Sequence, residues 1–257
     1  MKTIRFIGIA LLTVFINVCF TSCSSGGDDD DDKGSGDSPV TTNKFLVKQI
    51  MTDEKGEVRL ERTYSYDSKN RINIIKGSRI GNTEAPSFSY TYGDNSIESN
   101  GITYNVSNGR ITSTSNGMSF TYDNDGYIIS ASKNGSTLTY TWSGGNLTYI
   151  SYKRSSAMEE IESASYEYTN LTYPQNNPYS PEVADRSLED GFNEFPPLIG
   201  GYWGKTPKNL PKKYVHRYRG TMDEKDDYDY TMQDGYPSII TSTNSRGVVS
   251  TITCQWK

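Results

Sequence analysis

The chain has a single histidine, His216, which stands between Val215 and Arg217 in an alternating stretch typical of a strand. An imidazole there could act as a general base, because its ordinary pKa lies close to neutral pH. The cations around it would lower that pKa, and no G-x-S-x-G motif presents a serine nucleophile. We therefore expect a structural or solvated histidine, no catalytic residue and no enzymatic activity.

Two acidic stretches have residues that could bind a hard cation. The stretch Asp123-Asn124-Asp125-Gly126 begins like a calcium loop, but Asn134 stands where the loop needs a bidentate glutamate, so we expect a hairpin turn. Residues 223–227 read Asp-Glu-Lys-Asp-Asp, which predicts a solvated loop. One histidine and three cysteines offer little for a metal, and we expect no cofactor. A carboxylate pair for glycoside hydrolysis stays open, because its separation is spatial.

The first candidates for ligand contact are Tyr202 and Trp203. They lie between Gly200-Gly201 and Gly204, where the backbone can form an unusual turn and push large side chains outward. Four lysines follow and give a cationic patch for a glycan or an acidic partner: Lys205, Lys208, Lys212 and Lys213. In the alternative interpretation, which we favour, Trp203 folds back and plugs the sheet, because exposed tryptophan is uncommon.

The first 22 residues are typical of an export signal. Lys2 and Arg5 precede an apolar run from Ile7 to Phe20, which is too short for a transmembrane helix. Small residues then lead to Cys23. This arrangement resembles the lipobox of bacterial lipoproteins, and the resemblance implies that Cys23 carries the lipid and becomes the new N-terminus.

Residues 23–42 form a Gly/Ser-rich acidic tether with five consecutive aspartates at 28–32. Adjacent like charges repel one another and cannot pack. The placement resembles the acidic signal of Bacteroides-type lipoproteins, which implies an outer-membrane protein facing the cell surface. Six of the 31 acids lie in this tether, so residues 43–257 are close to neutral. A nucleic-acid binder would show a basic excess, and that class is excluded.

From residue 43 to residue 257 the dominant pattern is alternation. Aromatic residues at i and i+2 share one face of a strand and Ser/Thr lines the other, as in Ser89-Tyr90-Thr91-Tyr92. Turn residues separate about sixteen short strands of mostly four to eight residues. We predict a single all-β domain, an antiparallel meander that forms a strongly curved open sheet or a soluble barrel with aromatics inside and polar side chains outside.

A unit of aromatic pair, turn and Arg-Ile recurs, as in residues 66–72 and 104–111. It resembles the tyrosine-aspartate repeats of Rhs-type proteins, although the spacing is uneven. With the lipobox and the tether, the pattern resembles a Bacteroides lipoprotein family of unknown function with a porin-like fold. A proline-rich insertion around 174–211 interrupts the meander. In it Ser180-Pro181-Glu182 predicts a short helix to about Asp190, and the apolar run 195–203 predicts a cover or plug for the sheet.

These features predict a lipid-anchored envelope protein that binds a glycan or a protein at the surface. The alternative is a structural or assembly component of the outer membrane without a small-molecule ligand. The membrane is the expected partner through the N-terminal lipid.

Overall fold

The computed structural model describes residues 43–79, 87–154, 160–178 and 195–257. The described residues contain sixteen strands and no helix. The strands are β1 Leu46–Thr52, β2 Val58–Tyr66, β3 Ile72–Arg79, β4 Phe88–Tyr92, β5 Ser96–Ser99, β6 Ile102–Ser107, β7 Arg110–Thr114, β8 Ser119–Tyr122, β9 Ile128–Lys133, β10 Ser136–Ser143, β11 Asn146–Lys153, β12 Glu162–Thr172, β13 Asn209–Tyr218, β14 Thr221–Gln233, β15 Tyr236–Asn244 and β16 Val249–Trp256. The all-β prediction is confirmed.

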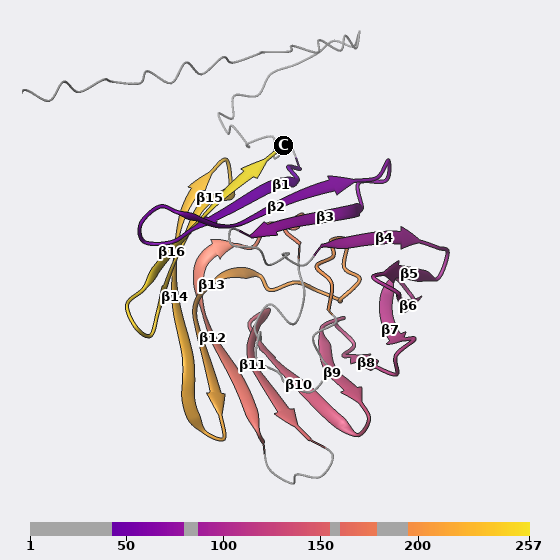
Figure 1. Ribbon diagram of the computed structural model, residues 1–257. Helices are drawn as coiled ribbons and strands as arrows, with labels where there is room; N and C mark the ends of the chain where they lie inside the picture. Colours follow the sequence, from indigo (N-terminus) through magenta and orange to yellow (C-terminus); the bar gives the residue numbers. More distant parts are fainter. Residues whose placement is uncertain (1–42, 80–86, 155–159, 179–194) are drawn as a thin grey trace, which may run out of the picture. The chain divides into compact units, whose positions relative to one another are not determined.

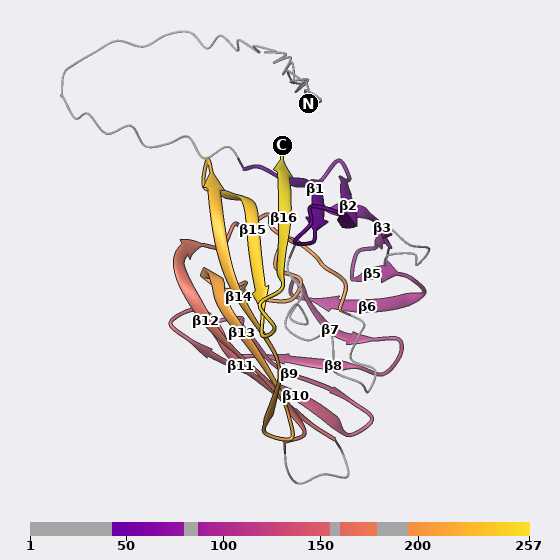
Figure 2. The same cartoon turned by 60° about the vertical axis from the view of Figure 1, so that its left-hand side comes forward.

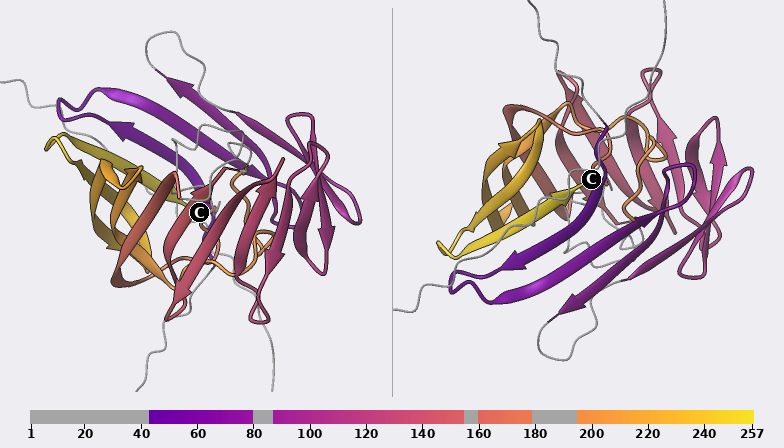
Figure 3. Two further views of the ribbon diagram at one scale, coloured as in Figure 1. Left: turned by 90° about the horizontal axis from the view of Figure 1, so that it is seen from below. Right: turned by 90° about the horizontal axis from the view of Figure 1, so that it is seen from above.

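The strands form a closed antiparallel barrel, so the barrel alternative holds rather than the open sheet (Figure 1). Each strand pairs with its neighbours in sequence, and β1 pairs with β16 to close the ring. The backbones of Phe45 and Lys257 exchange two hydrogen bonds of 2.7 and 2.9 Å at this seam. Figures 2 and 3 show the ring from other sides.

The barrel has two different ends. Phe45, just before β1, and Lys257, just after β16, lie at the end where β12 leaves the wall and β13 returns, which we call the insertion end. The opposite end carries hairpin turns such as β1–β2 and β9–β10, and we call it the hairpin end. Asn134 and Gly135 in the β9–β10 turn have φ of 52° and 80°. Positive φ suits these two residue types, so local chemistry sets this turn.

Side-chain alternation fills the barrel as predicted. The inward aromatics Tyr64, Tyr90, Phe120 and Tyr140 are buried, whereas Ser65, Thr91, Thr121 and Thr141 between the paired aromatics are exposed. The inward face packs into one hydrophobic core with buried isoleucines and leucines. Burial of aromatic and aliphatic side chains is the main favourable term in such a fold.

Seven inward aromatics in the described part of the chain share one further contact. Each lies near the insertion end of an even-numbered strand and donates its OH or ring N–H to a backbone carbonyl of the preceding strand, at 2.6 to 2.8 Å. They are Tyr66, Tyr92, Tyr122, Trp142, Tyr168, Tyr230 and Trp256, and we call them the tip-bonded aromatics. Four of them, Tyr66, Tyr122, Trp142 and Tyr168, directly follow a register shift in the ladder. Such a bulge re-aims the following side chain.

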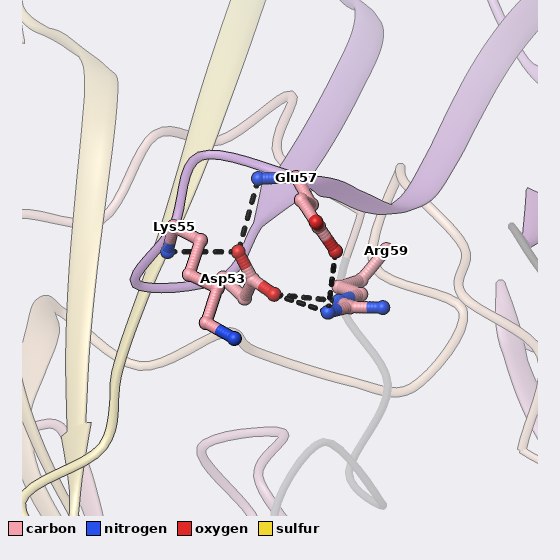
Figure 4. A network of polar contacts seen from close by, with 4 residues as sticks. All are labelled: Asp53, Lys55, Glu57 and Arg59. Carbon is pink, nitrogen blue, oxygen red and sulfur yellow. Dashed lines mark hydrogen bonds and ion pairs between the residues drawn. The ribbon is translucent and has the colours of Figure 1, made fainter.

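The turns are held by side-chain caps. In the β1–β2 turn, Asp53 Oδ1 accepts from the backbone N–H groups of Lys55 and Glu57, and its other oxygen accepts from Arg59 (Figure 4). In the β8–β9 turn, Asp123 Oδ1 accepts from the N–H groups of Gly126 and Tyr127 at 2.7 and 2.8 Å. The hairpin expected at residues 123–126 is confirmed.

Three sequence predictions need separate comment. The expected loop at 223–227 is wrong, because these residues belong to β14. By strand alternation Glu224 and Asp226 share one face, and Lys225 and Asp227 share the other, where they pair at 2.5 Å. Strands β12, β13 and β14 have 11, 10 and 13 residues, longer than the four to eight predicted for most strands.

The helix predicted from Pro181 to Asp190 lies outside the described residues. No described helix is long and apolar enough to cross a membrane.

The described part of the insertion that begins at Phe195 crosses the inside of the ring, seen in orange in Figure 1. Residues 195–204 form what we call the plug. Phe195, Leu198, Ile199 and Trp203 are all buried there. The Trp203 ring packs against Phe120 and Phe195 with centroids 5.3 and 5.0 Å apart. The plug contacts Tyr90 on β4, Tyr104 on β6 and Phe120 on β8, as a second apolar layer would.

Candidate functional site

The Trp203 side chain folds back into the barrel as part of the plug and is 1% exposed. Its ring N–H donates to the carbonyl of Pro196 at 3.0 Å. Tyr202 is half-buried and packs on Tyr92 with ring centroids 5.9 Å apart. Neither side chain offers a free aromatic platform, so Trp203 acts in the core and Tyr202 acts at its edge. Cys23 lies outside the described residues.

A cleft of about 680 Å³ lies at the insertion end, directly beyond the plug. We call it the end cleft. Its described lining comes from the turns β8–β9 and β10–β11, from the start of β7, from residues 172–176 and from residues 200–208. The lining includes three cationic side chains, Arg110, Lys205 and Lys208, and no described acidic side chain.

Residues 202–208 of the insertion are attached to the barrel rim at three positions. The Tyr202 carbonyl accepts from Ile111 N, Lys205 N donates to the Gly126 carbonyl, and Lys208 N donates to the Gly145 carbonyl, each at 2.9 Å. These partners belong to successive hairpins of the insertion end. Neighbouring hairpins are two strands, about 10 Å, apart. Between Tyr202 and Lys205 the chain passes through a turn closed by the hydrogen bond from Gly204 N to the Gly201 carbonyl at 2.8 Å. Residues 202–208 are therefore fixed to three successive hairpins of the rim.

Gly204 permits this close attachment. Its φ is +81°, and a Cβ there would meet the Gly126 carbonyl oxygen at 2.4 Å. Any larger residue would push the insertion away from the β8–β9 turn. The wall of the end cleft is thus fixed by backbone contacts rather than by side-chain packing alone.

Two of the three cations of the cleft lie near an aromatic ring. The Arg110 guanidinium lies 5.5 Å from the centroid of Tyr122, and Lys205 Nζ lies 5.1 Å from that of Tyr127. Tyr127 in turn packs against Trp142 at 4.5 Å. Burial raises the pKa of Tyr122, so its hydroxyl stays protonated and donates to the Ile111 carbonyl. Within the described residues, none of the three cations of the cleft forms an ion pair.

Two other cations at the surface, Arg71 and Lys213, are paired. Arg71 occupies the position in its hairpin that Arg110 occupies in the β6–β7 hairpin, and its guanidinium likewise lies over a tip-bonded aromatic, Tyr92, at 4.0 Å. Arg71 forms a 2.6 Å ion pair with Asp67, however. Lys213, expected to join the cationic patch, pairs with Glu167 on the outer wall. Lys212 is exposed on β13 and does not line the cleft. The structure therefore brings together Lys205 and Lys208, but not Lys212 and Lys213.

The lumen at the hairpin end differs. A cavity of about 250 Å³, which we call the polar lumen, is lined by Tyr214, Glu224, Asp226, Tyr228 and Ser242 among others. Ser242 donates to Asp226 at 3.0 Å. The alternation of β14 directs Glu224 and Asp226 to the same face as Tyr228, which packs against the core.

His216 is buried beside the polar lumen, so the structural alternative applies and not the solvated one. His216 is 1% exposed, and its Nε2 lies 3.7 Å from Oε2 of Glu162, which is 3% exposed. In the ladder His216 faces Ala164 on β12 and Glu224 on β14. The described residues contain no group of three or more His, Cys, Asp or Glu side chains suited to a metal. Burial raises the pKa of the Cys254 thiol on β16.

Sequence reasoning missed Arg110 and Tyr127 as parts of a site. Each stands directly after a hairpin turn and before an isoleucine, a position that by itself indicates only the start of a strand. Their cleft partners lie about 80 to 100 positions further along the chain, and no local pattern shows that contact. The signal that the sequence offers is the closeness of Lys205 and Lys208, which are three residues apart.

Comparisons with known proteins give structural neighbours only. No protein-family model and no curated protein matches the chain. The solved structures include a porin-like protein from Bacteroides uniformis ATCC 8492, with 15% identity, a TM-score of 0.40, and coverage of 82% of this chain and 96% of that one. A porin-like protein from Bacteroides vulgatus ATCC 8482 has 13% identity and a TM-score of 0.41, over 83% of this chain and 99% of that one.

Proposed function

We propose that the protein is a lipid-anchored component of the cell envelope that binds a ligand in the end cleft. The observation that carries this proposal is the cleft itself, which has about 680 Å³, three cationic side chains and an aromatic wall on a rigid rim. Ligand sites are typically concave, have about 300–1,000 Å³ and present a few fixed polar groups. The nearly neutral barrel makes this local group of cations distinctive.

The proposed location depends on the N-terminal sequence. The export signal, Cys23 and the tether with its five aspartates support a lipoprotein held at the outer membrane and facing the cell surface. A single acyl chain gives only marginal attachment, and the diacylglyceryl group of a lipoprotein adds further chains.

Removal of the anchor tests the location. Cys23→Ala should abolish incorporation of labelled fatty acid and release the protein from the membrane fraction, because one side chain carries the attachment. Cys19→Ala and Cys254→Ala are matched controls and should keep the label. A Cys23→Ala protein that is still labelled and still pellets with membranes would show that the lipoprotein proposal is wrong.

A second variant tests the tether. Replacing the aspartates at 28–32 by serine should leave the melting temperature of the barrel unchanged and reduce protease shaving of whole cells. The same positions replaced by glutamate keep the charge and serve as the control. Unchanged shaving of the serine variant would count against a role in surface display.

A glycan array probed with the mature full chain in detergent tests ligand binding. The double variant Lys205→Ala/Lys208→Ala should lose the array signal, whereas Lys55→Ala/Lys212→Ala removes the same charge outside the cleft and should retain it. A blank array together with one dominant cross-linked protein neighbour on whole cells would favour the assembly role and contradict the binding proposal.

A further inference from the structure

We propose, resting on the proposed binding function, that the ligand of the end cleft is a linear acidic oligosaccharide with carboxylate or sulfate groups on successive sugars. Three features of the cleft support this ligand class: a row of cations, an aromatic surface between them, and neutral polar groups beside them.

The row of cations follows from how the insertion is attached. Lys205 and Lys208 come from positions fixed to successive hairpins, so their backbones lie about 10 Å apart along the rim. Arg110 adds a third charge from the other side of the β8–β9 turn, where a Cβ on Gly126 would meet its Nη2 at 2.6 Å. A compact anion could contact only part of such a row, whereas a linear chain with repeated charges could contact all of it.

Arg110 is suited to a carboxylate or a sulfate ester. Its planar guanidinium presents a fork of N–H donors that matches two oxygens of one anionic group. At the equivalent position in another hairpin, the Arg71 guanidinium forms an ion pair with the Asp67 carboxylate of the chain itself. At Arg110 the described chain supplies no such carboxylate, so an anionic group of a ligand can take that place.

The aromatic and neutral groups distinguish a sugar chain from other polyanions. Tyr127 lies between the cations, with its ring packed on Trp142 and its hydroxyl directed toward Gly145, where a Cβ would meet it at 3.4 Å. A tyrosine offers an apolar surface and a hydroxyl together, which suits the C–H and O–H groups of a pyranose. Thr172, Gln175 and Thr206 also line the cleft and can hydrogen-bond to sugar hydroxyls.

The rim is ordered before any ligand arrives. The three backbone hydrogen bonds at Tyr202, Lys205 and Lys208 fix the insertion, and Asn146 accepts at 2.9 Å from the backbone of Asn209, where the insertion re-enters the wall. A preorganised site loses less entropy on binding. We therefore expect the cation row to keep its spacing in the complex.

The test is calorimetric titration of the mature full chain in detergent with a matched set of probes. The acidic probes are an oligogalacturonate and a sulfated dextran oligosaccharide, and their neutral counterparts are an oligogalactan and an unsulfated dextran oligosaccharide. We expect at least one acidic probe to bind on the order of 10-fold or more tightly than its counterpart, and its affinity to fall with added salt. The two acidic probes separate a carboxylate source from a sulfate source.

Variants assign the binding to the row. Lys205→Ala and Lys208→Ala should each weaken the acidic probe by about 2- to 5-fold, as for partly exposed charges. Arg110→Lys should weaken it although the charge is kept, because the fork is lost. Arg71→Lys is the matched control and should bind normally, with its melting temperature checked alongside.

Several outcomes would overturn the inference, and they differ from failure of the proposed function. Equal affinity for acidic and neutral probes would leave a binding module but exclude the acidic class. Inorganic sulfate or an oligoglutamate peptide that binds as tightly as the best acidic oligosaccharide would assign the cleft to compact anions or to acidic peptides. No binding of any probe, with a blank array, would contradict both proposals.

Discussion

The two hollows of the barrel, the end cleft and the polar lumen, are built from the same strand pattern but have opposite chemistry. The end cleft lies beyond the plug and has three cations, whereas the polar lumen has two carboxylates, Glu224 and Asp226. The plug contacts the inward faces of β4, β6 and β8 through Tyr90, Tyr104 and Phe120. On β14, polar residues replace such aromatic residues toward the hairpin end. The difference teaches that acidic side chains occupy inward positions beside an open cavity, whereas the inward positions that contact the plug are aromatic.

Among the variants considered, loss of the Trp203 side chain should destabilise the barrel most, because it removes the centre of the plug. Trp203→Ala should destabilise the barrel by about 3–5 kcal/mol, the usual range for a buried large aromatic, because a cavity would open between Phe120 and Phe195. Urea denaturation followed by circular dichroism measures the change. A loss below about 1 kcal/mol would show that the plug does not stabilise the barrel.

Phe120→Ala should lower the free energy of unfolding by a similar amount. The double variant Trp203→Ala/Phe120→Ala should lower it by less than the sum of the two single effects. The two rings contact each other, so the second truncation enlarges a cavity that already exists. Strict additivity in a double-mutant cycle would mean that the plug and the β8 wall are independent layers.

The tip-bonded aromatics sharpen the comparison at the insertion end. Tyr122→Phe keeps the ring and removes the hydrogen bond to the Ile111 carbonyl, and we expect a loss of about 1 kcal/mol in the free energy of unfolding. Tyr218→Phe, at the hairpin end and exposed, is the matched control and should have no measurable effect. Equal losses in both variants would remove the distinction between the two ends.

In the polar lumen the expected effect is smaller. Glu224→Gln keeps the shape of a half-buried side chain and removes a charge, so the free energy of unfolding should change by less than about 1 kcal/mol. Thermal melts at neutral pH measure it. A loss as large as that of Trp203→Ala would show that this lumen is as tightly packed as the plugged half.

The smallest effect concerns the β1–β2 turn shown in Figure 4 and depends on pH. The hydrogen bond from Arg59 lowers the pKa of the Asp53 carboxyl from 3.8, burial opposes this, and the N–H groups of Glu57 and Lys55 add to the lowering. A depressed pKa gives stability that is present above the unfolded value near 4 and is lost as the pH falls through the folded value.

Asp53→Asn should therefore lower the melting temperature slightly at neutral pH and by less in acid. Melts of both proteins between about pH 7 and pH 3 should converge at the acid end. Curves that remain parallel throughout would show that the Asp53 carboxylate does not contribute.

The strands and turns of the barrel wall can be predicted from the sequence, whereas the residues that meet in the end cleft cannot. Residues such as Tyr90 and Thr91 reveal their faces because the period of two is local, and Asn134-Gly135 reveals its turn for the same reason. Closure depends on the pairing of Leu46 with Trp256, which no local pattern encodes. Residues 223–227 were misread because charge suggests a loop unless the lumen beside the strand is known to be polar.

The seam between β1 and β16 makes the barrel suitable for circular permutation. It is the one pairing in the ring between strands far apart in sequence, and Phe45 and Lys257 meet there directly. A short linker could join these two residues, and new ends could open between Asn134 and Gly135. In this circular permutant the long-range pairing would move to β9 and β10, and ring closure would become a different step of folding.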